Sequence, residues 1–343
     1  MKMSSRGAGL ALALISFVLV NLTGECWGQG QPQFGFYKGK CGNNNVESIV
    51  RQKVIAKNNT DPTIVAALLR LQFHDCFVNG CDASILLDGN NTEKTAPPNL
   101  SVRGYDFIDE IKTALESACQ GVVSCADIIV MATRDAVSLS SIKGLGWYPV
   151  ETGRLDGLVS SAQNVNLPSP SMSIPQAAAA FANKKLSQTD MVYLIGGGHT
   201  VGVAHCPLFQ YRLYNFQNSS PDPTMNTTLL SKLKNTCPNQ NPPTSNPADL
   251  DQNPSSAFTV DKSFYQQILW GNGILQVDQE MALDSMTKST VATIARGTDL
   301  SFYLRFGQAM INLGRLTNSR GEIRKSCRAV NPTSSSGFFN LFH

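Results

Sequence analysis

The chain has 343 residues, 42% of them hydrophobic and 15% charged, which is ordinary for a globular protein. It is long enough for one large domain or two modest ones with a substantial core. Its formal net charge of +3 at pH 7 is close to balance. We therefore expect neither a nucleic acid nor a membrane as a partner.

The N-terminal 30 residues have a pattern that differs from the rest of the chain. Lys2 and Arg6 precede an apolar run over residues 10–20, which is too short to cross a bilayer comfortably. Small and polar residues follow, so we expect a secretory signal peptide that is cleaved after Gly28 or Gly30. The predicted organisation is a signal peptide (1–30), one main domain (31–331) and a C-terminal extension (332–343).

Secretion has consequences for the cysteines and asparagines. Cleavage would remove Cys26 and leave eight of the nine cysteines. An even number in a secreted chain favours four disulfides over buried free thiols, although sequence alone does not fix the pairing. N-x-S/T sequons would then be open to glycosylation. Five sequons start at Asn58, Asn90, Asn99, Asn218 and Asn226.

The first strong helical pattern begins at Asp61-Pro62, an acid suited to the N-cap followed by a proline suited to the first helical position. Ile64, Leu68 and Leu71 follow at i, i+4 and i+7 spacing. This apolar stripe predicts the face that the helix buries in the core.

Arg70 and His74 lie together on a second face of the same helix, because they are four residues apart. At about 100° of rotation per residue, that face is about 100° away from the apolar stripe. The helix therefore buries one side and presents Arg70, Phe73 and His74 on another.

Further helices are predicted over residues 105–118, 124–139, 175–182 and 299–315, where apolar residues recur at helical spacing. Asp127 in the second of these would need a partner once buried, and we expect an ion pair or a cap. Ser187 and Asp190 have the capping pattern of another helix, which glycines 196–198 would end. Residues 219–256 are rich in Pro, Asn and Ser and are predicted to form loops and short turns.

The four histidines of the chain differ in their surroundings. His343 is terminal, and His205 follows His199 by six residues, which predicts a surface position. A lone histidine is usually a structural residue. However, His74 and His199 lie in the unusual motifs LRLQFHDCFVNGCDAS (69–84) and LIGGGHTVGVAHC (194–206).

These two motifs strongly resemble the distal and proximal motifs of secreted plant (class III) haem peroxidases. VVSCADIIVMATRDAV, NLPSPS, ILQVDQE, MINLGRL and GEIRKSCRAVN also resemble segments of that family, in the family's order. The resemblance extends over residues 31–331. It implies a mainly α-helical haem peroxidase fold, in which two helical subdomains sandwich a haem and β structure is minimal.

The resemblance also implies an activity and its cofactors. The enzyme would carry one haem b and two calcium ions. It would reduce hydrogen peroxide and oxidise small phenolic donors in one-electron steps. Lignin precursors, suberin phenolics, auxin and extensin tyrosines are the donors left open, as is a role in removing peroxide under stress.

On one side of the haem, the resemblance makes His74 the general base for peroxide and Arg70 the charge that stabilises the breaking O–O bond. Asn99 would hydrogen-bond His74 and keep it basic, so its sequon would stay unglycosylated. On the other side, His199 would bind the iron and Asp278 would bond to its second ring nitrogen.

Other residues take structural or binding roles by the same resemblance. Phe73 would wall the haem pocket, and the carbonyl of Pro168 would contact the donor. The distal calcium would be bound by Asp75, Val78, Gly80, Asp82 and Ser84, and the proximal one by Thr200, Asp251, Ser256 (or Ser255) and Asp261. The implied disulfides are Cys41–Cys119, Cys76–Cys81, Cys125–Cys327 and Cys206–Cys237.

Two other classes of protein fit the sequence less well than a peroxidase. A binding or wall-structural glycoprotein would not need Arg70, His74, His199 and Asp278 to be intact. A metal-dependent hydrolase would need a third ligand near one of the two histidines, and the usual spacings lack one. We expect a monomer in the extracellular space or the cell wall; a vacuolar location directed by the extension stays open.

Overall fold

The structure is a computed structural model that describes residues 32–217, 220–318 and 320–332. The predicted signal peptide, the sequon at Asn218 and residues 333–343 of the predicted extension lie outside these ranges. Within them the chain is mainly α-helical, which confirms the predicted fold class. None of the described helices is both long enough and apolar enough to cross a membrane.

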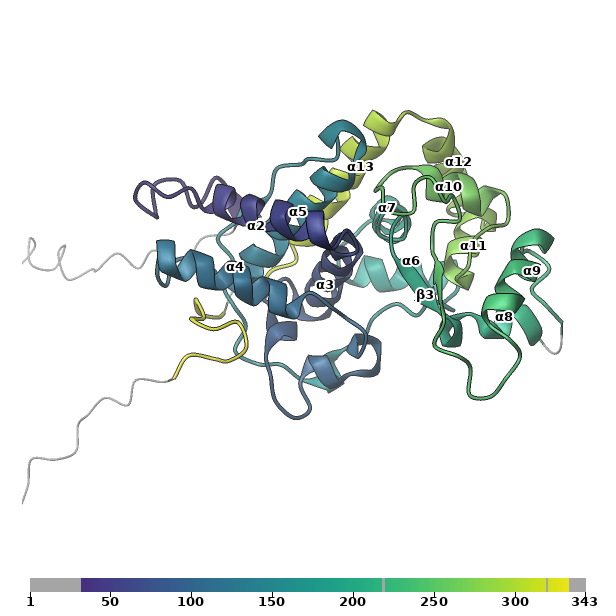
Figure 1. The fold of residues 1–343 in the computed structure, drawn as a ribbon, viewed down its shortest axis with the longest axis horizontal. Helices are drawn as coiled ribbons and strands as arrows, with labels where there is room; N and C mark the ends of the chain where they lie inside the picture. Colours follow the sequence, from purple (N-terminus) through teal and green to yellow (C-terminus); the bar gives the residue numbers. More distant parts are fainter. Residues whose placement is uncertain (1–31, 218–219, 319, 333–343) are drawn as a thin grey trace, which may run out of the picture. The chain divides into compact units, whose positions relative to one another are not determined.

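The helices follow one another along the chain with only short strands between them (Figure 1). The α-helices are α2 (Val46–Thr60), α3 (Ile64–Asn79), α4 (Tyr105–Ala118), α5 (Cys125–Ser140), α6 (Ile174–Asn183), α7 (Gln188–Gly198), α8 (Gln210–Tyr214), α9 (Thr227–Thr236), α10 (Ser263–Leu269), α11 (Gln276–Leu283), α12 (Lys288–Arg296) and α13 (Asp299–Gly314). The short 3-10 helices are η1 (Ser84–Leu86), η2 (Glu93–Thr95), η3 (Pro97–Asn99), η4 (Ile142–Gly144), η5 (Ala162–Asn164) and η6 (Cys206–Leu208).

Two antiparallel strand pairs complete the described structure. Strand β1 (Gln33–Phe34) pairs with β2 (Glu151–Thr152), and β3 (Val203–His205) pairs with β4 (Pro247–Asp249). Each pair has only two or three residues a strand. The strands therefore pin loops together, and helix packing forms the core.

Helix α3 lies at the centre of this packing. It packs on α5 and also contacts α7 and α13. Figure 1 shows α2 to α5 grouped in purple and blue, and α10 to α12 grouped in green beside α7. The last helix, α13, returns to pack on α7 and α3. This arrangement brings α3 and α7 into contact. Helix α3 carries His74, and α7 ends beside His199.

The predicted apolar face of α3 is buried, but the helix starts at a different residue than predicted. Ile64, Leu68 and Leu71 are all buried. The helix begins at Ile64 and not at Pro62. The carboxylate of Asp61 accepts a hydrogen bond from the backbone N–H of Thr63 at 3.2 Å. Asp61 therefore stabilises the turn before the helix and does not cap it.

The predicted loop over residues 219–256 is wrong in part, because it contains α9 and β4. The Oδ1 atom of Asn226 accepts hydrogen bonds from the N–H groups of Thr228 and Leu229, which makes Asn226 the N-cap of α9. Leu229 and Leu233, four residues apart, are the buried residues of this helix. The Asn cap and this spacing were the available signals, and the polar composition around them hid both.

The very apolar α5 is buried along nearly all its length, from Cys125 to Ser138. The predicted partner of its Asp127 exists. Arg154 Nη1 lies 2.8 Å from Asp127 Oδ1, and the Tyr37 hydroxyl donates to Asp127 Oδ2 at 2.6 Å. Both side chains of the ion pair are buried. Asp127 is thus a structural residue that ties α5 to the segment after β2.

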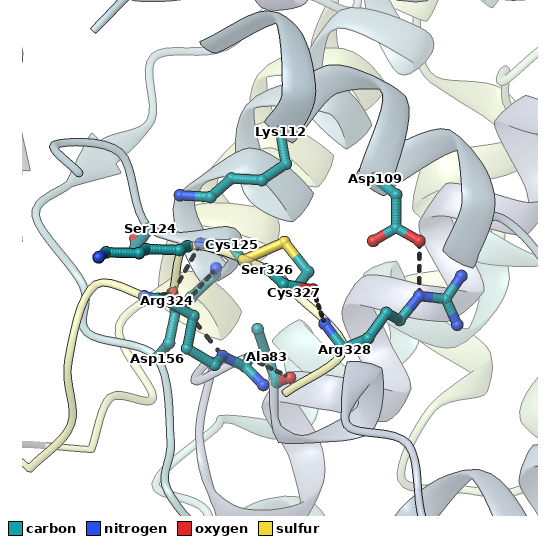
Figure 2. Close-up of a disulfide and its surroundings, with 12 residues drawn as sticks. Ala83, Asp109, Lys112, Ser124, Cys125, Asp156, Arg324, Ser326, Cys327 and Arg328 are labelled. Carbon is teal, nitrogen blue, oxygen red and sulfur yellow. Dashed lines mark hydrogen bonds and ion pairs between the residues drawn. A yellow bond between two sulfur atoms is a disulfide. The ribbon is translucent and has the colours of Figure 1, made fainter. Parts of the chain in front are cut away.

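All four disulfides implied by the resemblance are present. The Cys125–Cys327 disulfide joins the start of α5 to the C-terminal segment (Figure 2). Beside it, the buried carboxylate of Asp156 accepts hydrogen bonds from the N–H groups of Cys125 and Arg324. Arg324 in turn donates to the carbonyl of Ala83 at 2.6 Å. The C-terminal segment is thereby tied to the loop that follows α3.

Candidate active site

A cavity of about 290 Å³ lies against α3, α7 and α13. Its walls are mostly apolar, with Phe73, Leu194 and Met310 among the lining residues. Three side chains capable of ionic or acid–base chemistry also line it: Arg70 and His74 from α3, and His199 from the end of α7. The cavity therefore unites the two motifs that are 125 residues apart in the chain (199 − 74).

The end of α7 is built to bring His199 close to the core. Ser187 and Asp190 form the predicted capping box at the start of this helix. Near its end, a Cβ on Gly196 would lie 2.6 Å from the Tyr265 ring, and one on Gly197 would clash with Phe306. These glycines allow α10 and α13 to pack closely against the last turn of α7, which ends at Gly198 with His199 as its C-cap.

The His199 ring is bound on one side. Its Nδ1 atom lies 2.8 Å from Oδ1 of Asp278, which is completely buried in the first turn of α11. Nδ1 therefore carries the proton, and Nε2 is the ring nitrogen left with a lone pair for a ligand. The sequence motif around Asp278 indicated this pairing, whereas nothing in its local charge pattern did.

The opposite set of polar groups comes from α3 and the loop containing η3. His74 Nδ1 lies 2.6 Å from Oδ1 of Asn99, and Arg70 Nε donates to His74 Nε2 at 3.3 Å. The amide oxygen and the guanidinium together select the tautomer with its proton on Nδ1. His74 thus offers an unprotonated Nε2 beside a positive charge.

The protonation state of His74 follows from its surroundings. Burial, and then the positive charge of Arg70, lowers the pKa of His74 from 6.5 to about 4, although the bond to Asn99 acts in the opposite direction. A histidine with this pKa is neutral at physiological pH. The ring can therefore accept a proton but does not carry one before the reaction.

Asn99 is the most enclosed of the sequon asparagines in the described residues. It is 1% exposed, and its Nδ2 donates to the carbonyl of Glu93 at 2.8 Å. Both ends of its amide are therefore used inside the protein. By contrast, Asn58 is half-buried, and Asn90 and Asn226 are exposed.

The residues expected at the distal calcium site lie in the last turns of α3 and in the loop that follows it. Asp75 Oδ2 accepts from the N–H of Ala83 at 3.0 Å, whereas its buried Oδ1 has no partner within the described part of the chain. Ser84 Oγ donates to Glu93 Oε1 at 2.9 Å, and Glu93 Oε2 is likewise buried without a partner. Burial, followed by the charges of Asp82 and Glu93, raises the pKa of Asp75. Arg324 is the positive charge that acts on Asp75, and it does not offset these effects.

Glu93 was missed by the sequence reasoning. Its neighbours in GNNTEKTAPP read as an exposed loop, yet Glu93 is buried, and burial raises its pKa to about 7. The carbonyl of Val78, another expected ligand, accepts from Lys184 Nζ at 2.6 Å and keeps a second lone pair. No three His, Cys, Asp or Glu side chains among the described residues are grouped closely enough to bind a metal by themselves.

The residues expected at the proximal calcium site are also buried. Ser256 Oγ donates to Asp251 Oδ2 at 2.8 Å, whereas Ser255 is exposed, which favours Ser256 over Ser255. Thr200, directly after His199, donates its hydroxyl to the carbonyl of Gly197. Burial, together with the charge of Asp251, raises the pKa of Asp261 to about 6.

A second cavity, of about 450 Å³, lies between α4 and residues 325–328. Four of the five charged side chains that line it are paired, and the fifth, Lys325, is exposed. Arg328 Nε bonds to Asp109 at 2.6 Å (Figure 2), and Lys112 Nζ lies 2.6 Å from Glu116. Since no unpaired buried charge lines it, we do not treat it as a reaction site.

The fold and the first cavity define a helical enzyme in which one histidine can bind a metal centre and another can act as a base. The comparisons with known proteins agree. A family model described as Peroxidase matches residues 50–297. Two proteins of Arabidopsis thaliana illustrate the similarity: Peroxidase 60 is 49% identical over 326 residues (94% of this chain, 96% of the relative), and Peroxidase 57 is 46% identical over 305 residues (88% and 93%).

The chain therefore belongs to the peroxidase family. It is an oxidoreductase that reduces hydrogen peroxide, and the family implies a haem as its cofactor. The cavity fits such a group, because its walls are apolar and His199 has Nε2 left for iron.

Proposed function

We propose that this peroxidase binds one haem b through His199 and uses His74 and Arg70 to cleave hydrogen peroxide. The observation that carries the proposal is the single cavity shared by His74, Arg70 and His199. A bound haem would supply the iron that takes up the oxidising equivalents of the peroxide. The roles of the protein's own residues follow from the contacts described above.

His74 is the proton carrier of the proposed reaction. Its unprotonated Nε2 takes a proton from hydrogen peroxide and returns it to the oxygen that leaves as water. Asn99 holds the proton on Nδ1 and so keeps Nε2 unprotonated. Arg70, which contacts the same nitrogen, supplies positive charge where negative charge develops as the O–O bond breaks.

Asp278 has a different role, through His199. A buried carboxylate that accepts the Nδ1 proton makes the imidazole a more electron-rich ligand and fixes the orientation of its ring. Phe73 stacks on Phe77 with 4.9 Å between ring centroids and forms part of the apolar wall.

Small phenols are the donors that the cavity supports best. Val203 and Leu208 are exposed apolar side chains on its lining, and Pro168 lies beside them in the same lining. An aromatic ring with one hydroxyl can pack against such a surface and present its hydroxyl to a carbonyl, which is the role we give to Pro168.

We further propose two calcium ions. The distal ion would bind Asp75, Asp82, Ser84 and the carbonyls of Val78 and Gly80, where Asp75 has a buried oxygen without a partner. The proximal ion would bind Thr200, Asp251, Ser256 and Asp261. Carboxylate, hydroxyl and carbonyl oxygens are the ligands that calcium prefers.

We also propose that the enzyme is secreted as a monomer to the extracellular space or the cell wall. The four disulfides support an oxidising compartment. Asn58, Asn90 and Asn226 are the glycosylation candidates, with Asn218 outside the described residues. The vacuolar alternative is tested by comparing the location of the full chain with that of a chain lacking residues 332–343.

One experiment tests the proposed function. The purified protein is reconstituted with haem, its visible spectrum is recorded, and oxidation of a simple phenol by hydrogen peroxide is followed. His199→Ala should abolish haem binding. His205→Ala, which changes an exposed histidine bonded to the carbonyl of Ser245, should preserve it. A wild-type chain that takes up no haem would refute the proposal.

A further inference from the structure

The loop that carries Asn99 also holds Arg70. Arg70 Nη2 donates to the carbonyl of Pro98 at 2.8 Å. Arg70 Nη1 donates to the hydroxyl of Ser101 at 3.1 Å and approaches the carbonyl of Ser101 at 3.3 Å. Since Nε already contacts His74, all three guanidinium nitrogens have a partner.

We propose that Ser101 is a positioning residue for Arg70. Its hydroxyl holds Nη1, so that the guanidinium stays beside His74 in the geometry that peroxide cleavage requires. This inference rests on the proposed roles of Arg70 and His74. It assigns to Ser101 no contact with peroxide.

The physical reason is the flexibility of arginine. A free arginine side chain populates many rotamers and loses entropy when it is fixed, so its orientation must be imposed by its partners. The carbonyl of Pro98 fixes Nη2 of the planar guanidinium, and the bond to His74 fixes Nε. The Ser101 hydroxyl is the only side-chain oxygen among the described partners of Arg70, and it accepts a hydrogen bond from the third nitrogen, Nη1.

The same loop also fixes His74, through Asn99. Residues 97–101 therefore set the positions of both the base and the positive charge. Preorganised donors stabilise developing charge because they need no rearrangement during the reaction, and small displacements cost much of that effect. The loop is anchored in turn by Asn99 Nδ2 on the carbonyl of Glu93.

Glycosylation does not account for the hydroxyl at position 101. Ser101 completes the sequon Asn99-Leu100-Ser101. However, Asn99 is buried, and both ends of its amide are bonded within the protein. A glycan on Asn99 would break the contact to His74, so the positioning of Arg70 is the function that the structure leaves for this serine.

The test compares haem-loaded variants that keep or remove the hydroxyl. Ser101→Thr keeps the hydroxyl, and Ser101→Ala removes it. Ser101→Val also removes the hydroxyl, but its side chain has about the volume of threonine. The rate constant of the peroxide step, measured in a single turnover, should fall about tenfold in the Ala and Val variants, which corresponds to about 1.4 kcal/mol. It should stay within about twofold of wild type in Ser101→Thr.

Two further readouts separate positioning from a general loss of structure. The rate of phenol oxidation after the peroxide step should be unchanged in all three variants. Nη2 of Arg70 carries two hydrogens, of which one goes to Pro98, so the other can donate to fluoride, a small anion. The dissociation constant of fluoride should rise in the Ala and Val variants only. Ser231→Ala, in which an exposed serine loses a bond to the carbonyl of Thr227, is the matched control.

The outcomes distinguish this inference from the proposed function. An active wild type with equal peroxide rates and fluoride affinities in Ser101→Thr and Ser101→Val would overturn the role of the hydroxyl, while leaving the peroxidase assignment intact. If Ser101→Ala folds poorly, the Thr and Val pair still decides. A wild type that binds no haem would instead remove the proposed function itself.

Discussion

His199 and Asp278 form a buried pair in which 2.8 Å separates Nδ1 of the imidazole from Oδ1 of the carboxylate. The Asp278 side chain is fully buried, and its second oxygen has no partner among the described residues. The carboxylate therefore acts on this one ring. A negative charge in this position raises the electron density at Nε2, where the iron would bind.

Asp278→Asn tests this relationship, because asparagine keeps an acceptor oxygen and the shape but loses the charge. We expect the variant to bind haem with a more positive reduction potential and a peroxidase rate about 10–100 times lower, as is typical when such supporting partners are changed. Potentiometry and steady-state kinetics provide the measurements. Asp284→Asn, at the C-terminal end of the same helix, should leave both quantities unchanged. An unaltered potential in Asp278→Asn would contradict the role of the charge.

The pKa of His74 predicts the acid limb of the peroxide step. Burial and the charge of Arg70 lower that pKa to about 4. Protonation occupies the Nε2 lone pair, so the rate should be constant above this value and fall as the pH drops through about 4. Stopped-flow measurements of the peroxide step across this range would show it. A limb centred near 6.5 in the wild type would mean that His74 is not desolvated as described.

Arg70→Leu extends the same test. Removing the guanidinium removes a cause of the low pKa, so the acid limb should move to higher pH while the maximal rate falls. Arg103→Leu changes an exposed arginine that bonds to Thr63, and it should move neither. A limb that stays at the wild-type pH in Arg70→Leu would show that burial alone sets the pKa.

The sequence predicted the mainly helical fold class, and its motifs named residues that the structure places on one cavity. Distinctive motifs allowed the sequence to indicate His74, Arg70 and His199. A regular apolar stripe allowed α3 to be predicted. Glu93 escaped because burial of an acid depends on tertiary contacts, here with Ser84, that no local pattern encodes. Helix α9 escaped because two leucines in a polar segment give a weak periodic signal.

Removal of the proposed distal calcium should weaken catalysis as well as stability, because His74 and Asp75 are adjacent in α3. Without a cation, the charges of Asp82 and Glu93 act on the buried carboxylate of Asp75 and are offset only in part by Arg324, which favours rearrangement of the end of the helix. We expect chelation to lower both the melting temperature and the peroxide-step rate, and calcium to restore them. Loss of bound calcium, verified by metal analysis, with unchanged turnover would rule out this coupling.

A substitution at Lys184 should strengthen calcium binding, in contrast to chelation. Its ammonium lies 2.6 Å from the carbonyl of Val78, which we assign to the calcium. Lys184→Met removes a positive charge that competes for this oxygen, so calcium affinity should rise. Calorimetric titration of the metal-free protein measures the change, and a lower affinity would argue against Val78 as a ligand.

The buried ion pair of Asp127 and Arg154 should contribute more to stability than the more exposed ion pair of Arg315 and Glu151. Arg154→Met would leave Asp127 charged and buried without its cation, which costs about 3–5 kcal/mol when such a pair is broken. Arg315→Met breaks a pair with Glu151 in which the arginine is 52% exposed, and about 0–1 kcal/mol is expected there. Urea unfolding with the disulfides intact compares the two free energies. Equal losses would mean that the Tyr37 hydroxyl and the backbone N–H of Gly153, which also bond to Asp127, stabilise the carboxylate without Arg154.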